Sequence, residues 1–212
     1  EGKLDILYED DYILILNKPS NMPVHPVKSH QENTLANFVA FRCGITNCDF
    51  IFRAVNRLDC NTSGIVIVAK DRHTTSLLQG ADIEKHYIAV CHGVIDKSGT
   101  VNAPIRLCDN SKIVRCVSID GKRAVTHYNP VKVMNDRTVL DIVLETGRTH
   151  QIRCHMSYLG HPLMGDDLYG GEREEISRQA LHCGRVIFTH PYTEKTVDIE
   201  APLPLDIQNL IK

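Results

Sequence analysis

The sequence has no apolar run long enough to cross a membrane as a helix, and it has no basic start followed by an apolar segment that would direct secretion. Internal repeats, low-complexity tracts and a clear linker are missing as well. These absences argue against a helical membrane protein and against a secreted one. We therefore expect a cytoplasmic protein with no membrane partner, whose 212 residues form one domain over 1–212.

A strong excess of basic residues is also missing, because the formal net charge is −2. That balance is not typical of a nucleic-acid-binding protein, and by itself it indicates a mixed, solvated surface. A nucleic-acid partner would need a local positive field. The basic residues that could build one are Arg53, Arg57, Lys70, Arg72, Lys112, Arg115, Lys122, Arg123, Arg148 and Arg153.

The Cys-x-x-Cys motif is absent, although the chain has 8 cysteines. Several of them lie in apolar segments, which is typical of a reduced cytosolic protein, and we expect no disulfide framework. No metal site is indicated either. His150 and His155 are separated by about 140° around a helix, so their rings do not converge on one ion as a pair four residues apart would.

Short strand patterns and a few helix patterns are present instead. Apolar or alternating segments predict strands at 4–8, 12–16, 65–69, 85–94, 113–119, 124–134, 139–144, 180–189 and 196–199. Helical spacing and capping residues predict helices at 34–42 with Gly44 as the stop, from an N-cap at Asp71 through 78, at 149–159 and at 205–211. The turn pairs Asp120-Gly121 and Asn135-Asp136 favour antiparallel neighbours. We predict an α+β fold with a large mixed, mainly antiparallel sheet and flanking helices.

The stretch Ala54–Lys70 (AVNRLDCNTSGIVIVAK) has the clearest organisation. Asp59 precedes a cluster of turn formers that leads into the apolar strand 65–69, so its carboxylate would be held rigidly and remain reachable. An Asp and an Arg before a turn are, however, more often a cap or a surface pair. Arg57 lies two residues away, which in a strand-like stretch puts both side chains on one face. A plain salt bridge is the alternative for Arg57.

Three further segments stand out along the chain, namely NKPSNMPVHP (Asn17–Pro26), KHYIAVCHG (Lys85–Gly93) and GRTHQIRCHMSYLGHPLMGDDLYG (Gly147–Gly170). Together with the stretch around Asp59, and in this order, they resemble the RluA-type pseudouridine synthases. The signature of that family is His-Arg-Leu-Asp, two variable residues, Thr, Ser or Thr, Gly and an apolar strand. Asn56 departs from it, because many members have His there, but Asn can still donate and accept hydrogen bonds.

The resemblance implies a sheet-based catalytic domain with a central active-site cleft, which isomerises uridine in RNA without cofactor or metal. It gives Asp59 the essential role of nucleophile or base on a flipped-out uridine. It implies that Arg148 pairs with this carboxylate, that Tyr87 stacks on the uracil, and that Arg57 holds the nucleotide. Judged without the resemblance, Arg148 is equally well a surface residue at a strand–helix corner, and Tyr87 a packed strand aromatic.

The leading hypothesis is thus a monomeric RNA pseudouridine synthase acting on specific uridines of large-subunit ribosomal RNA, with transfer RNA as the alternative substrate. Lys122, Arg123 and Arg153 are expected to contact the RNA. Two other hypotheses stay open, a uracil-releasing N-glycosidase that uses Asp59 and a non-catalytic RNA-binding module. The chain begins with Glu1 and not Met, which leaves room for an upstream RNA-binding domain of the kind common in this family.

Overall fold

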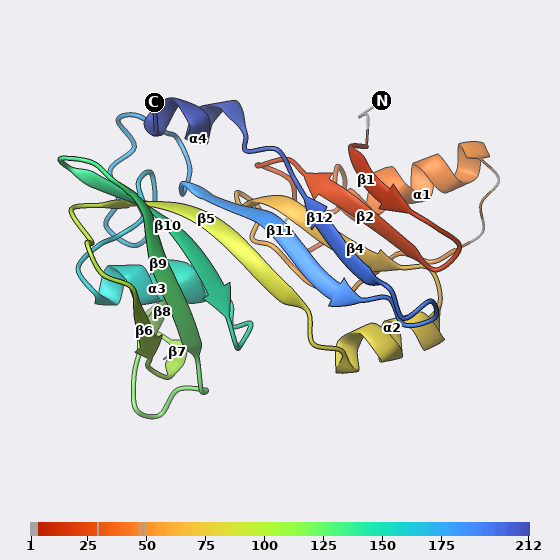
Figure 1. Ribbon diagram of the computed structural model, residues 1–212, viewed down its shortest axis with the longest axis horizontal. Coiled ribbons are helices and arrows are strands. Elements are labelled where there is room, and N and C mark those ends of the chain that lie inside the picture. Colours follow the sequence, from red (N-terminus) through yellow and green to blue (C-terminus); the bar gives the residue numbers. More distant parts are fainter. Residues whose placement is uncertain (1–3, 29, 47, 49) are drawn as a thin grey trace. The chain divides into compact units, whose positions relative to one another are not determined.

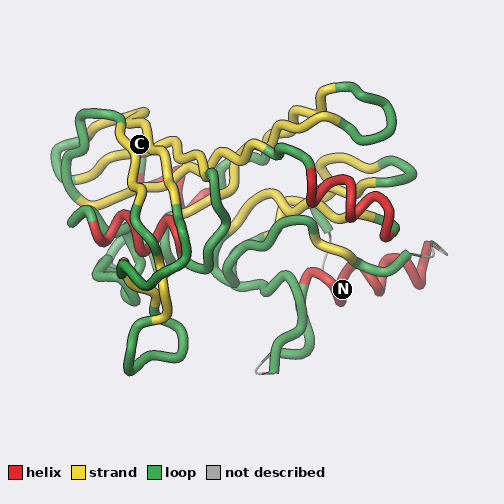
Figure 2. The backbone as a smooth tube through the Cα atoms, turned by 90° about the horizontal axis from the view of Figure 1, so that it is seen from below, coloured by secondary structure: helices red, strands yellow, loops and turns green. Residues whose placement is uncertain are grey.

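The computed structural model describes residues 4–28, 30–46, 48 and 50–212. By its internal contacts the chain divides into two compact units. The first comprises the chain up to Lys85 together with Cys183–Pro202, and the second comprises His86–His182 and Leu203–Lys212. Strands (yellow in Figure 2) outnumber helices (red) in both units, which confirms the predicted α+β class.

The first unit is built on a sheet whose two central strands, β2 (Ile13–Lys18) and β4 (Ser63–Ala69), are buried along nearly their whole length. Its other strands are β1 (Ile6–Glu9), β3 (Arg53–Ala54), β11 (Leu181–Thr189, mostly in this unit) and β12 (Thr196–Glu200). Neighbours follow the order β1-β2-β4-β11, with β12 also on β11 (Figure 1). The two-residue strand β3 pairs with β4 as well. β1 and β2, which pair antiparallel, confirm the strands predicted at 4–8 and 12–16. Every residue of β4 is buried. A strand covered on both faces has a nearly continuous apolar run, as residues 65–69 do.

Two helices belong to the first unit, α1 (Leu35–Thr46) and α2 (Arg72–Gly80). α2 begins as predicted, since the Asp71 carboxylate accepts a hydrogen bond from the Thr74 backbone N–H at 2.8 Å. α1 begins as predicted but continues through Gly44 to Thr46. The expected stop was wrong because Gly44 does not adopt the left-handed conformation that ends a helix, and a glycine inside a helix only weakens it.

The second unit has a four-stranded antiparallel sheet and a separate two-stranded one. Its elements are β5 (Glu84–His92, mostly in this unit), β6 (Gly99–Asn102), β7 (Ile105–Leu107), β8 (Arg115–Val117), β9 (Val125–Val133), β10 (Arg137–Leu144), α3 (Gln151–Tyr158) and α4 (Leu205–Leu210). The strand order is β5-β10-β9-β6, and β7 pairs with β8. The apolar core beside β5 and β10 consists of Val90, Val139, Met164, Ile176, Ala180, Ile207 and Leu210.

One predicted pairing in the second unit is wrong and one is right. β9 and β10 form the hairpin expected at Asn135-Asp136. Asp120-Gly121 does not join β8 to β9 as a hairpin, because β8 pairs with β7 and β9 pairs with β6 and β10. At Gly121 the chain turns back onto Ile105, and a Cβ atom on Gly121 would lie 2.6 Å from the Ile105 nitrogen. The short strands β6 and β7, which pair with β9 and β8 respectively, were not predicted.

None of the helices in the described ranges has both the length and the apolar character needed to cross a bilayer.

Candidate active site

Asp59 lies on a turn that enters β4 in the first unit. Its side chain is half-buried, and its backbone carbonyl accepts a hydrogen bond from the Thr62 N–H at 3.1 Å. The carbonyl of the next residue, Cys60, accepts one from the Met22 N–H, also at 3.1 Å. The carboxylate is therefore carried by a backbone that is fastened on both sides, as a reactive residue requires.

A buried lysine fastens the same turn. Lys18 has 0% exposure, and its ammonium donates to the backbone carbonyls of Pro19 and Met22 at 2.8 Å each and of Cys60 at 3.0 Å. A buried charge is tolerated only where such partners replace water. Lys18 thus connects the proline-rich N-terminal segment to the Asp59 turn. The sequence singled out Lys18 only as part of NKPSNMPVHP, and it gave no sign of this bond to Cys60.

Asn56 bonds to the backbone of β4 with both ends of its amide. Its Nδ2 donates to the Ile65 carbonyl at 2.9 Å, and its Oδ1 accepts from the Ile67 N–H at 2.8 Å. The side chain therefore takes the place of a backbone partner and holds the segment before Asp59 against the strand. A residue that both donates and accepts is needed, which agrees with the expectation for this departure from the family pattern.

Arg57 is exposed, as a residue that contacts RNA must be. β3 ends at Ala54, so the strand alternation from which we placed Arg57 and Asp59 on one face does not reach them. Burial and the positive charge of nearby Arg57 lower the pKa of His25. The His25 ring meets the Phe52 ring edge-on, with centroids 5.1 Å apart.

Tyr87 lies on β5 in the second unit and is 6% exposed. It pairs with Ile142 on β10, while the preceding His86 pairs with Val143. Directly opposed residues in an antiparallel pair share a face, and successive residues alternate between faces. Tyr87 and Ile142 therefore share one face of this sheet, and His86 and Val143 share the other. The strand environment predicted for Tyr87 is confirmed, and its contact with a nucleotide stays a prediction.

Arg148 and Arg123 come together at the corner before α3. The exposed Arg148 donates from Nε to the Arg123 backbone carbonyl at 2.9 Å, and its own N–H donates to Gln151 Oε1 at 3.0 Å. Arg123 is exposed and pairs with Glu145 at 2.6 Å. Lys122, the adjacent residue, is exposed as well. Three of the predicted cations, Lys122, Arg123 and Arg148, therefore form one basic corner of the second unit.

Arg153 has a different environment from the one predicted. It is 7% exposed and makes a two-point ion pair with Asp166, with Nε–Oδ2 at 2.7 Å and Nη2–Oδ1 at 2.8 Å. Its guanidinium also lies over the Tyr169 ring, 5.0 Å from the centroid. Separating a buried pair would leave a carboxylate without its cation, which is costly. The RNA contact predicted for Arg153 stays a prediction, and in this geometry it would require the pair with Asp166 to open. The sequence alone could not show that an Arg on this helix faces inward.

The two histidines rejected as metal ligands have hydrogen-bond partners in the second unit. His150 Nδ1 lies 3.0 Å from the Tyr169 hydroxyl, and His155 bonds to the Thr126 hydroxyl and the Ala103 carbonyl at 2.8 and 2.9 Å. Within the described ranges, no three His, Cys, Asp or Glu side chains gather as a candidate metal site.

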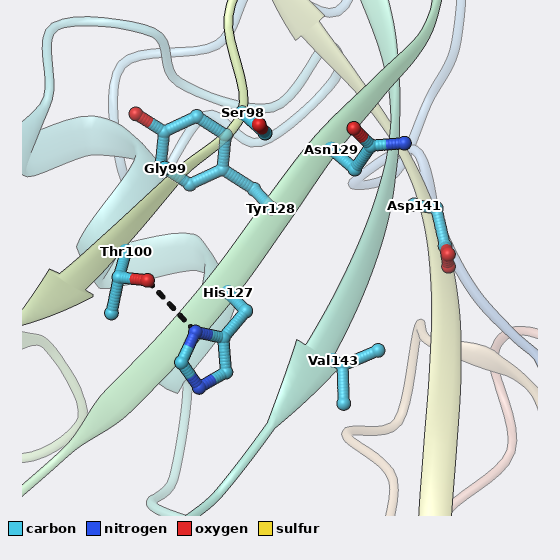
Figure 3. Close-up of a pocket in the computed structure, with 8 residues that line it drawn as sticks. All are labelled: Ser98, Gly99, Thr100, His127, Tyr128, Asn129, Asp141 and Val143. Atoms are coloured by element: carbon cyan, nitrogen blue, oxygen red, sulfur yellow. Dashed lines mark hydrogen bonds between the residues drawn. The ribbon is translucent and has the colours of Figure 1, made fainter.

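A shallow pocket of about 350 Å³ lies on the β6-β9-β10 sheet (Figure 3). None of the predicted catalytic residues lines it, and Val143, on its wall, lies on the sheet face opposite to Tyr87. His127 there bonds to the Thr100 hydroxyl at 2.8 Å. This pocket contains none of the predicted catalytic groups, so the Asp59 turn remains the candidate active site. Its lining residues are Ser98, Gly99, Thr100, His127, Tyr128, Asn129, Asp141 and Val143.

Comparison with known proteins now places the chain. Residues 12–158 match the family model described as RNA pseudouridylate synthase. An uncharacterized RNA pseudouridine synthase, YjbO, of Bacillus subtilis is 46% identical over 99% of this chain and 76% of its own length. Ribosomal large subunit pseudouridine synthase D of Xanthomonas campestris is 37% identical over 98% of this chain and 68% of its own length. The solved structure of human RNA pseudouridylate synthase domain containing 1 has the same fold, with a TM-score of 0.78 at 24% identity over 94% of this chain and 83% of that one.

The family model and the curated relatives define an enzyme class, the isomerases that act on RNA. The chain belongs to the RNA pseudouridine synthase family, which confirms the resemblance drawn from its motifs.

Proposed function

We propose that this enzyme converts specific uridines of large-subunit ribosomal RNA to pseudouridine, with Asp59 as the essential nucleophile or base. The observation that supports the role of Asp59 most directly is its setting, a half-buried carboxylate in the family signature on a turn held by Lys18, Met22 and Thr62. The choice of ribosomal RNA rests on the relatives named ribosomal large subunit pseudouridine synthase D.

The reaction is an isomerisation, so its atoms balance without a co-reactant. The bond between the uracil nitrogen and the ribose carbon breaks, the uracil turns, and a ring carbon bonds to the ribose carbon. The ring carbon then loses its proton and a ring nitrogen gains one. Asp59 would act either by covalent attack or by removing a ribose proton, and both are established roles for a carboxylate.

The remaining residues divide into catalytic and RNA-binding roles. Tyr87 would stack on the uracil and assist loss of the carbon-bound proton, since a base removed from its helix needs an aromatic partner. Arg148 takes the basic catalytic role that the family motif gives it. Arg57, Lys122 and Arg123 are exposed cations and would contact RNA phosphates, which supply most of the affinity in such complexes.

Residues 1–212 would act as the catalytic domain, as a monomer, and in the cytoplasm where the proposed RNA is found. No cofactor enters the proposed reaction.

The test is pseudouridine mapping of total cellular RNA by carbodiimide modification and primer extension. The gene is deleted and then restored as wild type or as Asp59→Asn. We expect loss of one or a few ribosomal sites and rescue by the wild type only. Rescue by Asp59→Asn would overturn the catalytic assignment, and loss confined to transfer RNA would overturn the substrate. Release of free uracil by the purified enzyme would instead support the N-glycosidase hypothesis.

A further inference from the structure

Two cysteines meet at the carboxyl end of α1 in the first unit. Cys43 lies in the helix and is 9% exposed, and Cys48, two residues beyond the end of α1, is half-buried. The Cys48 N–H donates to the Cys43 carbonyl at 3.1 Å. The two thiols also interact closely enough to shift each other's pKa. A disulfide needs its Cα atoms about 4.4–6.8 Å apart. The bond from the Cys48 N–H to the Cys43 carbonyl brings the two backbones together, as a disulfide would require.

The surroundings of Cys48 stabilise a sulfur anion. The Thr46 hydroxyl lies 3.3 Å from Cys48 Sγ and 2.9 Å from the Arg42 carbonyl oxygen. A hydroxyl has one proton to donate, and it can turn from the carbonyl to the sulfur when the sulfur is charged. The Arg42 guanidinium adds a nearby positive charge, which Glu9 partly balances through two bonds of 3.0 and 2.8 Å.

The two thiols are consequently unequal. Hydrogen bonds from Cys43 and Thr46, with the charge of Arg42, lower the pKa of Cys48. Burial and the neighbouring Cys48 raise the pKa of Cys43. The thiolate is the nucleophilic form of cysteine. Cys48, which has the lowered pKa and is the more accessible of the two, therefore supplies the reactive sulfur, and Cys43 stays protonated beside it.

We propose that Cys43 and Cys48 form an oxidisable dithiol whose substrate is a peroxide, with Cys48 as the attacking sulfur and Cys43 as the resolving one. In the first step the Cys48 thiolate attacks a peroxide oxygen, the O–O bond breaks, and a sulfenic acid and a hydroxide form. In the second, the Cys43 sulfur displaces the hydroxyl group from Cys48 to give a disulfide, and the Cys43 proton leaves in a water molecule. The two sulfurs supply the two electrons that reduce the peroxide.

The other cysteines provide comparisons within the same chain. Cys108 contacts Cys116 in the second unit, but burial and that contact raise the pKa of Cys108. Cys91 is fully buried, and burial raises its pKa strongly. Cys60 is exposed and lies in the same unit as Cys48. Exposure alone therefore does not distinguish Cys48, and the thiol and hydroxyl donors around its sulfur do.

The experiment uses the full reduced chain in native buffer at neutral pH, treated with hydrogen peroxide and analysed by peptide mass spectrometry. We expect a peptide in which Cys43 and Cys48 are joined with the loss of two hydrogen atoms, formed before oxidation is seen at Cys60. In Cys43→Ser, dimedone should label Cys48 as the trapped sulfenic acid. In Cys48→Ser, Cys43 should stay reduced. Circular dichroism establishes that each variant is folded.

Thr46→Val tests the assigned chemistry at an exposed position, without removing a thiol. It should slow disulfide formation several-fold. Cys60→Ser is the control, because it removes an exposed thiol elsewhere in the same unit, and it should leave the rate of disulfide formation unchanged. Two results would overturn the proposal. One is oxidation of Cys60 ahead of Cys48, and the other is dimedone labelling of Cys43 instead of Cys48. The readouts involve no RNA, so the outcome is independent of the function proposed above.

Discussion

At the scale of single residues, Asn56 shows how a departure from a family pattern can be absorbed. Both of its hydrogen bonds go to β4 backbone groups, so the side chain is part of the sheet and holds the segment that leads to Asp59. A side chain that only accepts would leave the Ile65 carbonyl facing a second oxygen.

Asn56→Asp should therefore lower the free energy of unfolding by about 1–3 kcal/mol, the usual cost of leaving a buried polar group without its partner. Urea denaturation measures this loss. Asn129→Asp, which makes the same change on the exposed side of β9, is the control and should have little effect. Equal shifts in the two variants would show that the bonds of Asn56 to β4 do not stabilise the fold.

Arg148 is a second residue whose shape matters as well as its charge. Its Nε bond to the Arg123 carbonyl uses the planar guanidinium. Lysine keeps the charge but cannot repeat this geometry. Arg148→Lys should lower kcat by about 10²-fold, which is a typical loss for one electrostatic group in an active site. Steady-state kinetics measures this, with Arg173→Lys, in an exposed ion pair with Asp167, as the control. An unchanged kcat in Arg148→Lys would mean that charge alone suffices.

At the scale of elements, the β1–β2 hairpin depends on one acidic residue in its turn. Asp10 accepts hydrogen bonds from the Tyr8 hydroxyl at 2.7 Å and from the N–H groups of Tyr12 and Ile13 at 2.8 and 2.7 Å, and His190 Nε2 lies 2.9 Å from Oδ2. Burial opposes ionisation of Asp10, but these donors outweigh it, so its pKa lies below the usual 3.8.

A carboxylate whose pKa is lowered by folding stabilises the protein above the pKa of the unfolded chain, and this contribution is lost as the pH falls through the lowered value. Asp10→Asn should therefore cost about 1–3 kcal/mol at pH 7, with a smaller difference from the wild type at pH 3. Urea unfolding at the two pH values measures it, and Asp11→Asn at the exposed neighbour is the control. A difference that grows on acidification would contradict this account of the turn.

The elements also show how far the sequence predicts the structure. The strands with apolar runs and the helix capped by Asp71 were predictable, because local pattern and burial agree there. β6 and β7 were not, since they have only four and three residues and depend on pairing with β9 and β8. The same holds for side chains. Motif resemblance singled out Asp59 as a candidate, but the burial of Arg153 and the three carbonyl partners of Lys18 depend on tertiary contacts that no local pattern contains.

At the scale of the whole molecule, a net charge of −2 must be reconciled with a polyanionic substrate. In the proposed function, binding would depend on local clusters such as Lys122, Arg123 and Arg148, and each phosphate contact would contribute a counterion to the salt dependence.

Lys122→Ala should weaken RNA binding mildly and reduce the slope of log K against log salt by about 1. Fluorescence anisotropy over a range of salt concentrations measures the slope. Lys132→Ala removes the same charge elsewhere in the second unit, where Lys132 bonds to the Ile211 carbonyl, and should leave the slope unchanged. Identical slopes for wild type and Lys122→Ala would remove Lys122 from the RNA interface.

The measurement that tests the central claim most directly compares wild type and Asp59→Asn on the RNA segment that cellular mapping identifies, with binding and single-turnover pseudouridine formation followed in parallel. The substitution keeps the size of the side chain and removes its charge. We predict that affinity stays within a few-fold while product formation is abolished, because phosphate contacts dominate binding and the carboxylate performs the chemistry. Product formation that persists in bound Asp59→Asn, or a collapse of affinity with turnover per bound RNA preserved, would contradict the assignment of Asp59 as the catalytic residue.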